Sequence, residues 1–218
     1  MASVRCLPKA PAIPAPFVFS GRAELSALGD RFDNDAMDDI VRQAIAKWPN
    51  VPHCYGWLGL DARGQWFMRD DRTQAAGPFP QWRGSLLRHD KLIEFIQRNY
   101  ERDEVGCSFF QNGPQRVYVE LEAAPLVLRV GPGPQVTTHT GEALSPRGTL
   151  VDEQGRLFAI TDRGLGLVHT LDMHAAADLV DQGLWKPDAT RADDLPQRFG
   201  YVLSPAAVKA GARATAPS

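Results

Sequence analysis

Two Asp-Arg pairs are the residues whose type and position best fit a ligand site in this sequence. Asp71-Arg72 and Asp162-Arg163 each follow an apolar run that is typical of a β-strand. Two arginines can bind an anionic ligand with forked hydrogen bonds, and the aspartates can orient them through charge-assisted hydrogen bonds. The more common role of an aspartate at a strand end is to accept backbone hydrogen bonds while the arginine lies in solvent. We treat these four residues as candidate ligand-binding residues.

The two pairs close segments that match each other along the chain. Residues 60–72 and residues 151–163 align without a gap. They share an aspartate, a glycine three positions later, a phenylalanine and the closing pair: Asp61/Asp152, Gly64/Gly155, Phe67/Phe158, Asp71/Asp162 and Arg72/Arg163. The Asp-to-Gly spacing is typical of a type I turn followed by a left-handed glycine, which joins the two strands of a hairpin. We therefore predict a duplicated hairpin, and a pseudo-twofold relation between its copies would bring the two arginines together.

The elements around each hairpin predict an α+β fold, with two tandem units of antiparallel strands and a packed helix in each. A helical pattern of apolar residues follows Asp90 in the first unit and Asp172 in the second, where Gly183 marks the helix end. An Asn-Gly-Pro turn at residues 112–114 separates two further strand-like runs. Strands cluster before and after each helix, which is unlike the alternation of parallel βαβ folds.

Proline and glycine set the boundaries that we expect. The first unit opens with a helix, because apolar side chains recur at three- and four-residue steps from Met37 to Trp48. The expected parts are a proline-rich extended arm (residues 1–20), a first unit (residues 33–130), a linker (residues 131–135), a second unit (residues 136–204) and a flexible tail (residues 205–218).

The strand-like run at residues 115–122 alternates between apolar and polar side chains. Val117, Val119 and Leu121 share one face, and the other face carries Glu120 and Glu122 together with a tyrosine. Successive side chains of a strand point to opposite faces of its sheet. The pattern therefore predicts one dry face and one solvent-exposed face for this strand.

Composition excludes some classes of function. The chain has 218 residues, 44% of them hydrophobic, and a formal net charge of -2. Such values are ordinary for a soluble globular protein and give no bias toward nucleic acid or anionic membrane. No apolar run approaches the roughly 20 residues that span a bilayer. Three widely spaced cysteines form no disulfide framework, so we expect reduced thiols and a cytoplasmic protein.

Metal and thiol chemistry have little support in the sequence. His53, Cys54, Cys107 and His139 carry donor atoms that suit zinc, but no pair has the spacing of a CxxC or HxxxH ligand motif. Both cysteines lie in apolar, strand-like context, where a buried and inert thiol is the usual case. We expect no metal and no cofactor.

Trp82 is the best candidate for an exposed partner-binding residue among the tryptophans. It follows Phe79 and Pro80 in a segment that the sequence predicts to be a loop. Tryptophan is over-represented at binding hot spots. A loop can also fix its own conformation with a single aromatic side chain, and the sequence does not separate these two roles.

One further run carries a family resemblance. Residues 112–122, Asn-Gly-Pro-Gln-Arg-Val-Tyr-Val-Glu-Leu-Glu, lie downstream of Gly56-Trp57 and the first hairpin. Together they resemble an uncharacterised proteobacterial family known only as a domain of unknown function. The order of hairpin, helix and strands is also similar to another such family, with repeated motifs and a suggested signalling role. The resemblance covers residues 50–204, implies a repeated α+β architecture and favours binding or regulation over catalysis.

These observations favour a non-enzymatic ligand- or protein-binding protein with a regulatory role and a site near the cleft between the repeated units. The alternative is an enzyme that acts on a small anionic substrate through Asp71, Arg72, Asp162 and Arg163. A third possibility is a structural interaction module that uses the proline-rich arm and Trp82.

Overall fold

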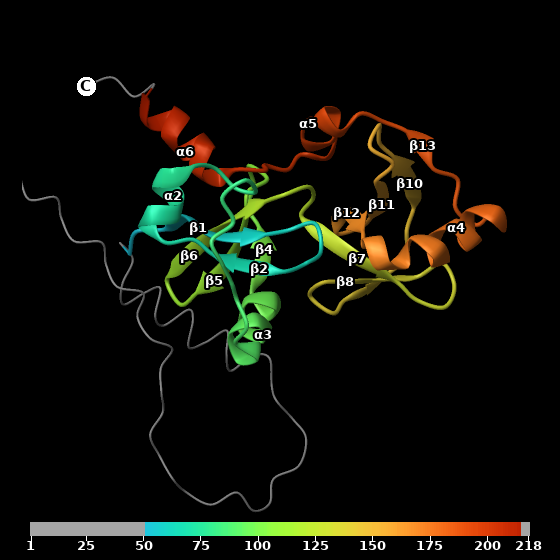
Figure 1. Cartoon of the computed structure of the whole chain (residues 1–218), viewed down its shortest axis with the longest axis horizontal. Helices are drawn as coiled ribbons and strands as arrows, with labels where there is room; N and C mark the ends of the chain where they lie inside the picture. The colour runs from blue at the N-terminus through green and yellow to red at the C-terminus, as the bar shows by residue number, and fades with distance from the viewer. Residues whose placement is uncertain (1–50, 215–218) are drawn as a thin grey trace, which may run out of the picture. The chain divides into compact units, whose positions relative to one another are not determined.

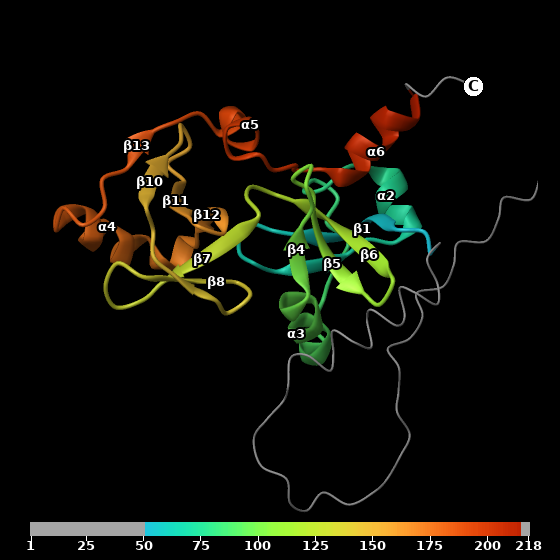
Figure 2. The same ribbon diagram turned by 180° about the vertical axis from the view of Figure 1, so that it is seen from behind.

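The computed structural model describes residues 51–214, with side chains to residue 212. The predicted arm at residues 1–20 and the predicted helix from Met37 to Trp48 lie outside the described residues. Two β-sheets organise the described part of the chain, as the views from opposite sides show (Figures 1 and 2). No helix in this part is both long and apolar enough to cross a membrane.

Six strands form the first sheet, in the order β3-β2-β1-β6-β5-β4. β1 and β6 lie at its centre and run parallel, whereas its other neighbouring strands are antiparallel. The bounds are β1 (Cys54–Leu60), β2 (Trp66–Met68), β3 (Ser85–Leu86), β4 (Tyr100–Arg102), β5 (Ser108–Asn112) and β6 (Gln115–Leu121). Along the chain, α2 (Asp71–Ala76) lies between β2 and β3, and α3 (Asp90–Arg98) lies between β3 and β4. The predicted helix after Asp90 and the hairpin at residues 112–114 are confirmed.

Seven strands form the second sheet, in the order β13-β10-β11-β12-β7-β8-β9. Their bounds are β7 (Leu126–Val130), β8 (Val136–Thr138), β9 (Ala143–Leu144), β10 (Gly148–Val151), β11 (Leu157–Thr161), β12 (Gly164–Val168) and β13 (Asp188–Ala189). The short helices that follow β12 are η1 (Thr170–Asp172), α4 (Met173–Asp181), η2 (Ala192–Asp194) and α5 (Leu195–Phe199). The helix predicted after Asp172 is therefore confirmed as α4.

The α+β class is confirmed, and the two sheets indicate two units, but two details of the predicted architecture are corrected. The sheets are mixed, because β1 pairs with β6, β12 with β7 and β10 with β13 in parallel. Residues 131–135 do not separate the sheets, because they join β7 to β8, and Val130 pairs with Val136 in one ladder. The chain passes from the first sheet to the second between β6 and β7.

The two predicted hairpin turns have the same hydrogen-bond pattern. Oδ1 of Asp61 accepts hydrogen bonds from the amides of Arg63 (2.9 Å) and Gln65 (2.8 Å). The equivalent atom of Asp152 accepts from the amides two and four positions later, at 3.0 and 2.8 Å. Each turn also holds its glycine in the left-handed region, with φ of 74° at Gly64 and 76° at Gly155. Turn geometry therefore explains the shared aspartate and glycine.

The C-terminal segment that we predicted to be a flexible tail contains a helix, α6 (Pro205–Ala214). Glu120 of β6 accepts hydrogen bonds from the Ser204 hydroxyl (2.5 Å) and the Ala206 amide (3.1 Å) at the start of α6. Only 3% of Glu120 is exposed, so the face of β6 that we predicted to be solvent-exposed is covered at this position. Burial raises the pKa of the Glu120 carboxyl, although both hydrogen bonds favour its charged form.

His139, which follows β8, joins the two sheets. Its Nδ1 accepts a hydrogen bond from the Val127 amide of β7 at 3.2 Å. Its ring packs against Trp66 of β2 and Tyr100 of β4, with centroid distances of 5.7 and 5.2 Å. Its carbonyl oxygen accepts a hydrogen bond from Nε2 of Gln97 on α3 at 2.6 Å. One residue of the second sheet therefore contacts three elements of the first unit.

Stability should fall in acid through His139. Burial lowers the pKa of its ring from 6.5 to about 4. Between these two pH values the unfolded chain therefore binds a proton at this ring, whereas the folded chain does not. The stabilising contribution of the neutral ring to the free energy of unfolding is complete above pH 6.5 and is lost as the pH falls toward 4. We expect the difference in free energy of unfolding between the native protein and His139→Gln to shrink by roughly 2–3 kcal/mol from neutral pH to pH 4.5.

Urea unfolding followed by circular dichroism at several pH values measures this difference. His174→Gln, at an exposed position of α4, is the matched control and should track the native protein. A constant difference between the native protein and His139→Gln would contradict the assignment of a neutral, buried ring.

Candidate binding site

The structure places the two predicted Asp-Arg pairs in different local settings. Asp71 and Arg72 are the first residues of α2, whereas Asp162 and Arg163 form the turn between β11 and β12. Within residues 51–214, no hydrogen bond or ion pair joins one pair to the other, and Nε of Arg163 contacts Oε2 of Glu142 at 3.2 Å. The described contacts therefore do not bring the two arginines onto a common partner.

Asp70 explains why the first pair does not end a strand. Its Oδ1 accepts hydrogen bonds from the Thr73 amide (2.8 Å) and the Thr73 hydroxyl (2.6 Å), which caps the N-terminus of α2. The chain leaves β2 after Met68 and turns into this short helix. The second hairpin instead continues from β11 into β12 through a two-residue turn.

Arg72 and Trp82, which we singled out separately, border the same surface hollow. Its volume is about 420 Å³, and it lies between α2 and the segment that precedes β3. Trp82 is 51% exposed, so much of its indole is open to a partner. The lining residues are Asp70, Arg72, Thr73, Ala76, Gln81, Trp82, Arg83 and Gly84.

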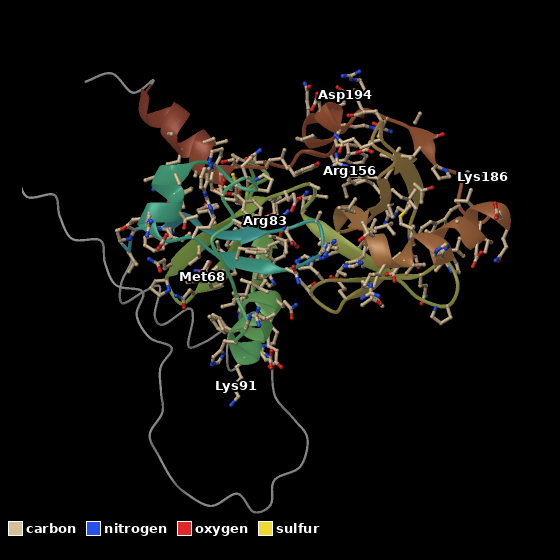
Figure 3. The ribbon with its side chains drawn as sticks, in the orientation of Figure 1. Met68, Arg83, Lys91, Arg156, Lys186 and Asp194 are labelled. Carbon is tan, nitrogen blue, oxygen red and sulfur yellow. The ribbon has the colours of Figure 1, made fainter. Side chains whose placement is uncertain are left out.

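A second hollow, of about 390 Å³, meets the first at Arg83. It is formed by the turn between β1 and β2 together with Glu122, which follows β6. Arg83 lies beside β1 and β2 (Figure 3), with its guanidinium 5.6 Å from the ring centroid of Phe67. The lining residues are Asp61, Ala62, Arg63, Gln65, Arg83 and Glu122.

Arg83 pairs with both carboxylates of the second hollow. Its Nη1 lies 3.3 Å from Oδ2 of Asp61, and its Nη2 lies 3.0 Å from Oε2 of Glu122. The Ala62 amide donates a further hydrogen bond to Oε2 of Glu122 at 3.1 Å. The side chain of Arg83 remains 43% exposed, and it therefore keeps donor surface for a ligand while it fixes the edge of both hollows.

A buried arginine positions the loop that carries Trp82. Arg69 is 3% exposed and donates hydrogen bonds to the carbonyl oxygens of Gly56 (3.1 Å), Gly77 (2.6 Å) and Trp82 (3.0 Å). Burial lowers the pKa of its guanidinium, and the negative charge of Glu120 opposes this effect. Arg69 thus ties both ends of the loop at residues 77–82 to β1.

Sequence reasoning did not identify Arg69 or Arg83, and it placed Glu122 only on the solvent-exposed face of a strand. Arg69 directly follows an apolar run, and Glu122 follows an alternating strand. The role of each of the three residues depends on partners that are distant along the chain. The sequence match between the two hairpin segments did identify Asp61, but as a turn residue and not as a partner of Arg83. Spacing within one segment cannot reveal such contacts.

The residues that we considered for metal or thiol chemistry have structural partners. Nδ1 of His53 accepts a hydrogen bond from the Arg116 amide (3.2 Å), and His139 lies between the sheets. Burial raises the pKa of the Cys107 thiol to about 11, which disfavours a thiolate nucleophile. Across the part of the chain that the structure describes, no group of three or more His, Cys, Asp or Glu side chains is arranged to hold a metal ion.

The fold is α+β, and two hollows lined by charged side chains meet on its surface. The chain belongs to the DUF2944 family, described as "Protein of unknown function (DUF2946)", whose family model matches residues 37–206. This match supports the resemblance to a family of unknown function, and the comparison with curated proteins gives no match.

Two solved structures are similar to part of the chain. One is a DUF1285 family protein from Silicibacter pomeroyi DSS-3, with a TM-score of 0.41, 15% identity, and coverage of 60% of this chain and 73% of that chain. The other is a DUF1285 family protein from Shewanella baltica OS155, with a TM-score of 0.36, 14% identity, and coverage of 56% and 91%.

Arg69 and Arg72 should differ sharply in their effect on stability. We expect Arg69→Met to lower the free energy of unfolding by about 2–4 kcal/mol, because three carbonyl oxygens lose their donor and Glu120 loses a nearby cation. Arg72→Met, at an exposed position without an ion pair inside residues 51–214, should change it by less than about 0.5 kcal/mol. Urea unfolding at neutral pH measures the change in free energy of unfolding for both variants. Similar small losses for the two variants would show that Arg69 does not hold the loop.

Proposed function

We propose that this protein is a non-catalytic binding protein with a regulatory role, and that it binds an anionic partner. Its site is the Arg83 surface, which we define as the two hollows that meet at Arg83, with Arg63, Arg72 and Trp82 on their borders. The observation that carries this proposal is the placement of Arg72, Trp82 and Arg83 around one hollow of about 420 Å³.

The chemistry of these side chains suits an anion that also has an apolar or planar part. A guanidinium offers several donors that match carboxylate or phosphate geometry. An indole adds a large apolar face at a low cost in side-chain entropy. Within residues 51–214, no ion pair joins Arg63 or Arg72 to a carboxylate. Asp70 lines the same hollow as Arg72 and interacts with its charge.

The Arg83 surface adjoins the passage from the first sheet to the second. Glu122 lines the second hollow and directly follows β6, and the chain enters the second sheet at β7. On the other side of the same turn, a Cβ atom at Gly64 would lie 3.3 Å from Cβ of His139. This location supports the cleft between the two units as the region of the site.

We also propose that the two hairpins are copies of one unit, which the matching hydrogen bonds of Asp61 and Asp152 support. A cytoplasmic location fits the free thiols of Cys54 and Cys107. The enzymatic alternative requires Asp71, Arg72, Asp162 and Arg163 to face one substrate. No described contact favours this arrangement over binding alone.

Ligand binding should depend on Arg72 and Trp82 but not on Arg163. We expect a panel of phosphates, nucleotides and small carboxylates to contain compounds that raise the melting temperature of the native protein, because a ligand that binds only the folded state stabilises it. Arg72→Ala and Trp82→Ala should remove most of that shift, while Arg163→Ala, whose side chain contacts Glu142, should keep it.

Thermal-shift measurements followed by calorimetric titration of the best compound test this expectation. Equal losses for Arg72→Ala and Arg163→Ala would favour the alternative in which both Asp-Arg pairs face one ligand. Shifts that all three variants retain would remove the Arg83 surface as the site.

A further inference from the structure

The helix α6 is attached to the first sheet at its first turn. Glu120 of β6 accepts two hydrogen bonds from the start of the helix, at 2.5 and 3.1 Å. Pro205 is the only buried side chain among residues 205–212, and Val208 is 50% exposed. A helix of ten residues has little stability of its own in water. The position of α6 therefore depends on polar contacts with the sheet more than on apolar surface that the helix itself buries.

The second turn of α6 places a cation on the sheet. Lys209 lies four residues after Pro205, so both side chains are on one side of the helix. Nζ of Lys209 lies 3.9 Å from the ring centroid of Tyr55 on β1, which is a cation–π contact. Tyr118 of β6 is stacked on Tyr55 with a centroid distance of 4.4 Å and an interplanar angle of 15°. A ring this close leaves no room for an ammonium, so Lys209 occupies the opposite face of Tyr55.

The stack of Tyr55 and Tyr118 is held by residues outside α6. The hydroxyl of Tyr118 donates a hydrogen bond to Oδ2 of Asp103 at 3.1 Å, and Tyr118 is 6% exposed. Oδ1 of the same carboxylate accepts hydrogen bonds from two backbone amides, at 3.2 and 2.8 Å. The ring of Phe109 on β5 packs against Tyr118 with a centroid distance of 5.8 Å. These contacts fix the stack whether or not Lys209 lies on it.

The family match separates the stack from the residue that covers it. The family model matches residues 37–206, which include Tyr55, Asp103 and Tyr118. Lys209 and most of α6 follow the matched residues. The stack therefore belongs to the domain that the family model describes, and the cation on it comes from a C-terminal addition.

We infer that the stack of Tyr55 and Tyr118 is a binding site for a lysine side chain of a partner protein, and that α6 is a displaceable strap that fills this site with Lys209. The ammonium that lies on Tyr55 identifies the occupant, because a lysine of the partner makes the same cation–π contact when it replaces Lys209. The residues of this site are not those of the Arg83 surface, so the inference does not rest on the proposed function.

The competition between the two lysines sets the expected affinities. Lys209 is tethered to the domain and acts at a high effective concentration, which weakens the apparent affinity for a partner. The test uses the full chain and a fluorescein-labelled peptide with three lysines separated by Gly-Ser, at about 0.15 M salt. Fluorescence anisotropy should show that Lys209→Ala binds this peptide several-fold more tightly than the native protein. Val208→Ala, at the exposed neighbouring position, should bind like the native protein.

Variants of Tyr55 separate recognition from folding. In the Lys209→Ala background, Tyr55→Leu should remove the gain in affinity, because an aliphatic side chain offers no π face. Tyr55→Phe keeps the ring and should keep the gain. Circular dichroism confirms that both double variants are folded. A peptide with norleucine in place of lysine should not bind to any of these proteins.

Amide hydrogen exchange tests the strap directly. Lys209→Ala should speed the exchange of the amides of α6 and leave those of β1 and β6 unchanged, because only the helix loses a contact that holds it. A saturating concentration of the lysine peptide should have the same effect on the native protein.

Three results would overturn the inference. Equal peptide affinities for the native protein and Lys209→Ala would show that Lys209 does not block the site. A gain in affinity that persists with Tyr55→Leu would show that the stack is not the site. Exchange of the α6 amides that responds to neither Lys209→Ala nor the peptide would show that α6 is a fixed part of the fold. None of these results bears on the binding of small anions at the Arg83 surface.

Discussion

The buried carboxylate of Asp61 is the contact on which both the first hairpin and the candidate site depend. Its Oδ1 binds two amides of the turn between β1 and β2, and its Oδ2 receives Arg83 from the segment before β3. A buried carboxylate is stable only when such donors compensate the loss of water. The turn therefore requires a cation at this point, and Arg83 in turn joins Asp61 to Glu122 and borders both hollows.

Local patterns were sufficient where the determining contacts lie within a few residues. The two hairpin turns, the Asn-Gly-Pro turn and the helices after Asp90 and Asp172 were predicted because turn geometry and apolar periodicity act over short distances. The parallel pairing of β1 with β6 was missed because those strands are far apart along the chain. For the same reason, the glycine- and proline-rich residues 131–135 look like a linker although they connect two paired strands.

The candidate site was predictable only in pieces. The match between residues 60–72 and residues 151–163 pointed to Arg72, and a predicted loop pointed to Trp82, but nothing in the sequence placed the two residues at one hollow. Their proximity depends on Asp70, which starts α2, and on Arg69, which binds the loop from the interior. We predicted that Glu120 lies on a solvent-exposed face, because the alternation of apolar and polar side chains distinguishes the two faces of a strand. The alternation does not show which other elements pack on each face. Here the start of α6 covers that face.

The two hairpins differ in the source of the cation that their buried aspartate requires. In the second hairpin, Nε of Arg156 lies 2.7 Å from Oδ2 of Asp152, so the turn supplies its own cation. The equivalent position of the first hairpin is Gln65, and the cation comes from Arg83 beyond the Trp82 loop. The first turn is therefore complete only when the segment from Trp82 to Arg83 is in place. Arg83 thus shares Asp61 with this turn, and Gly64 of the same turn lies beside His139, which packs between the two sheets.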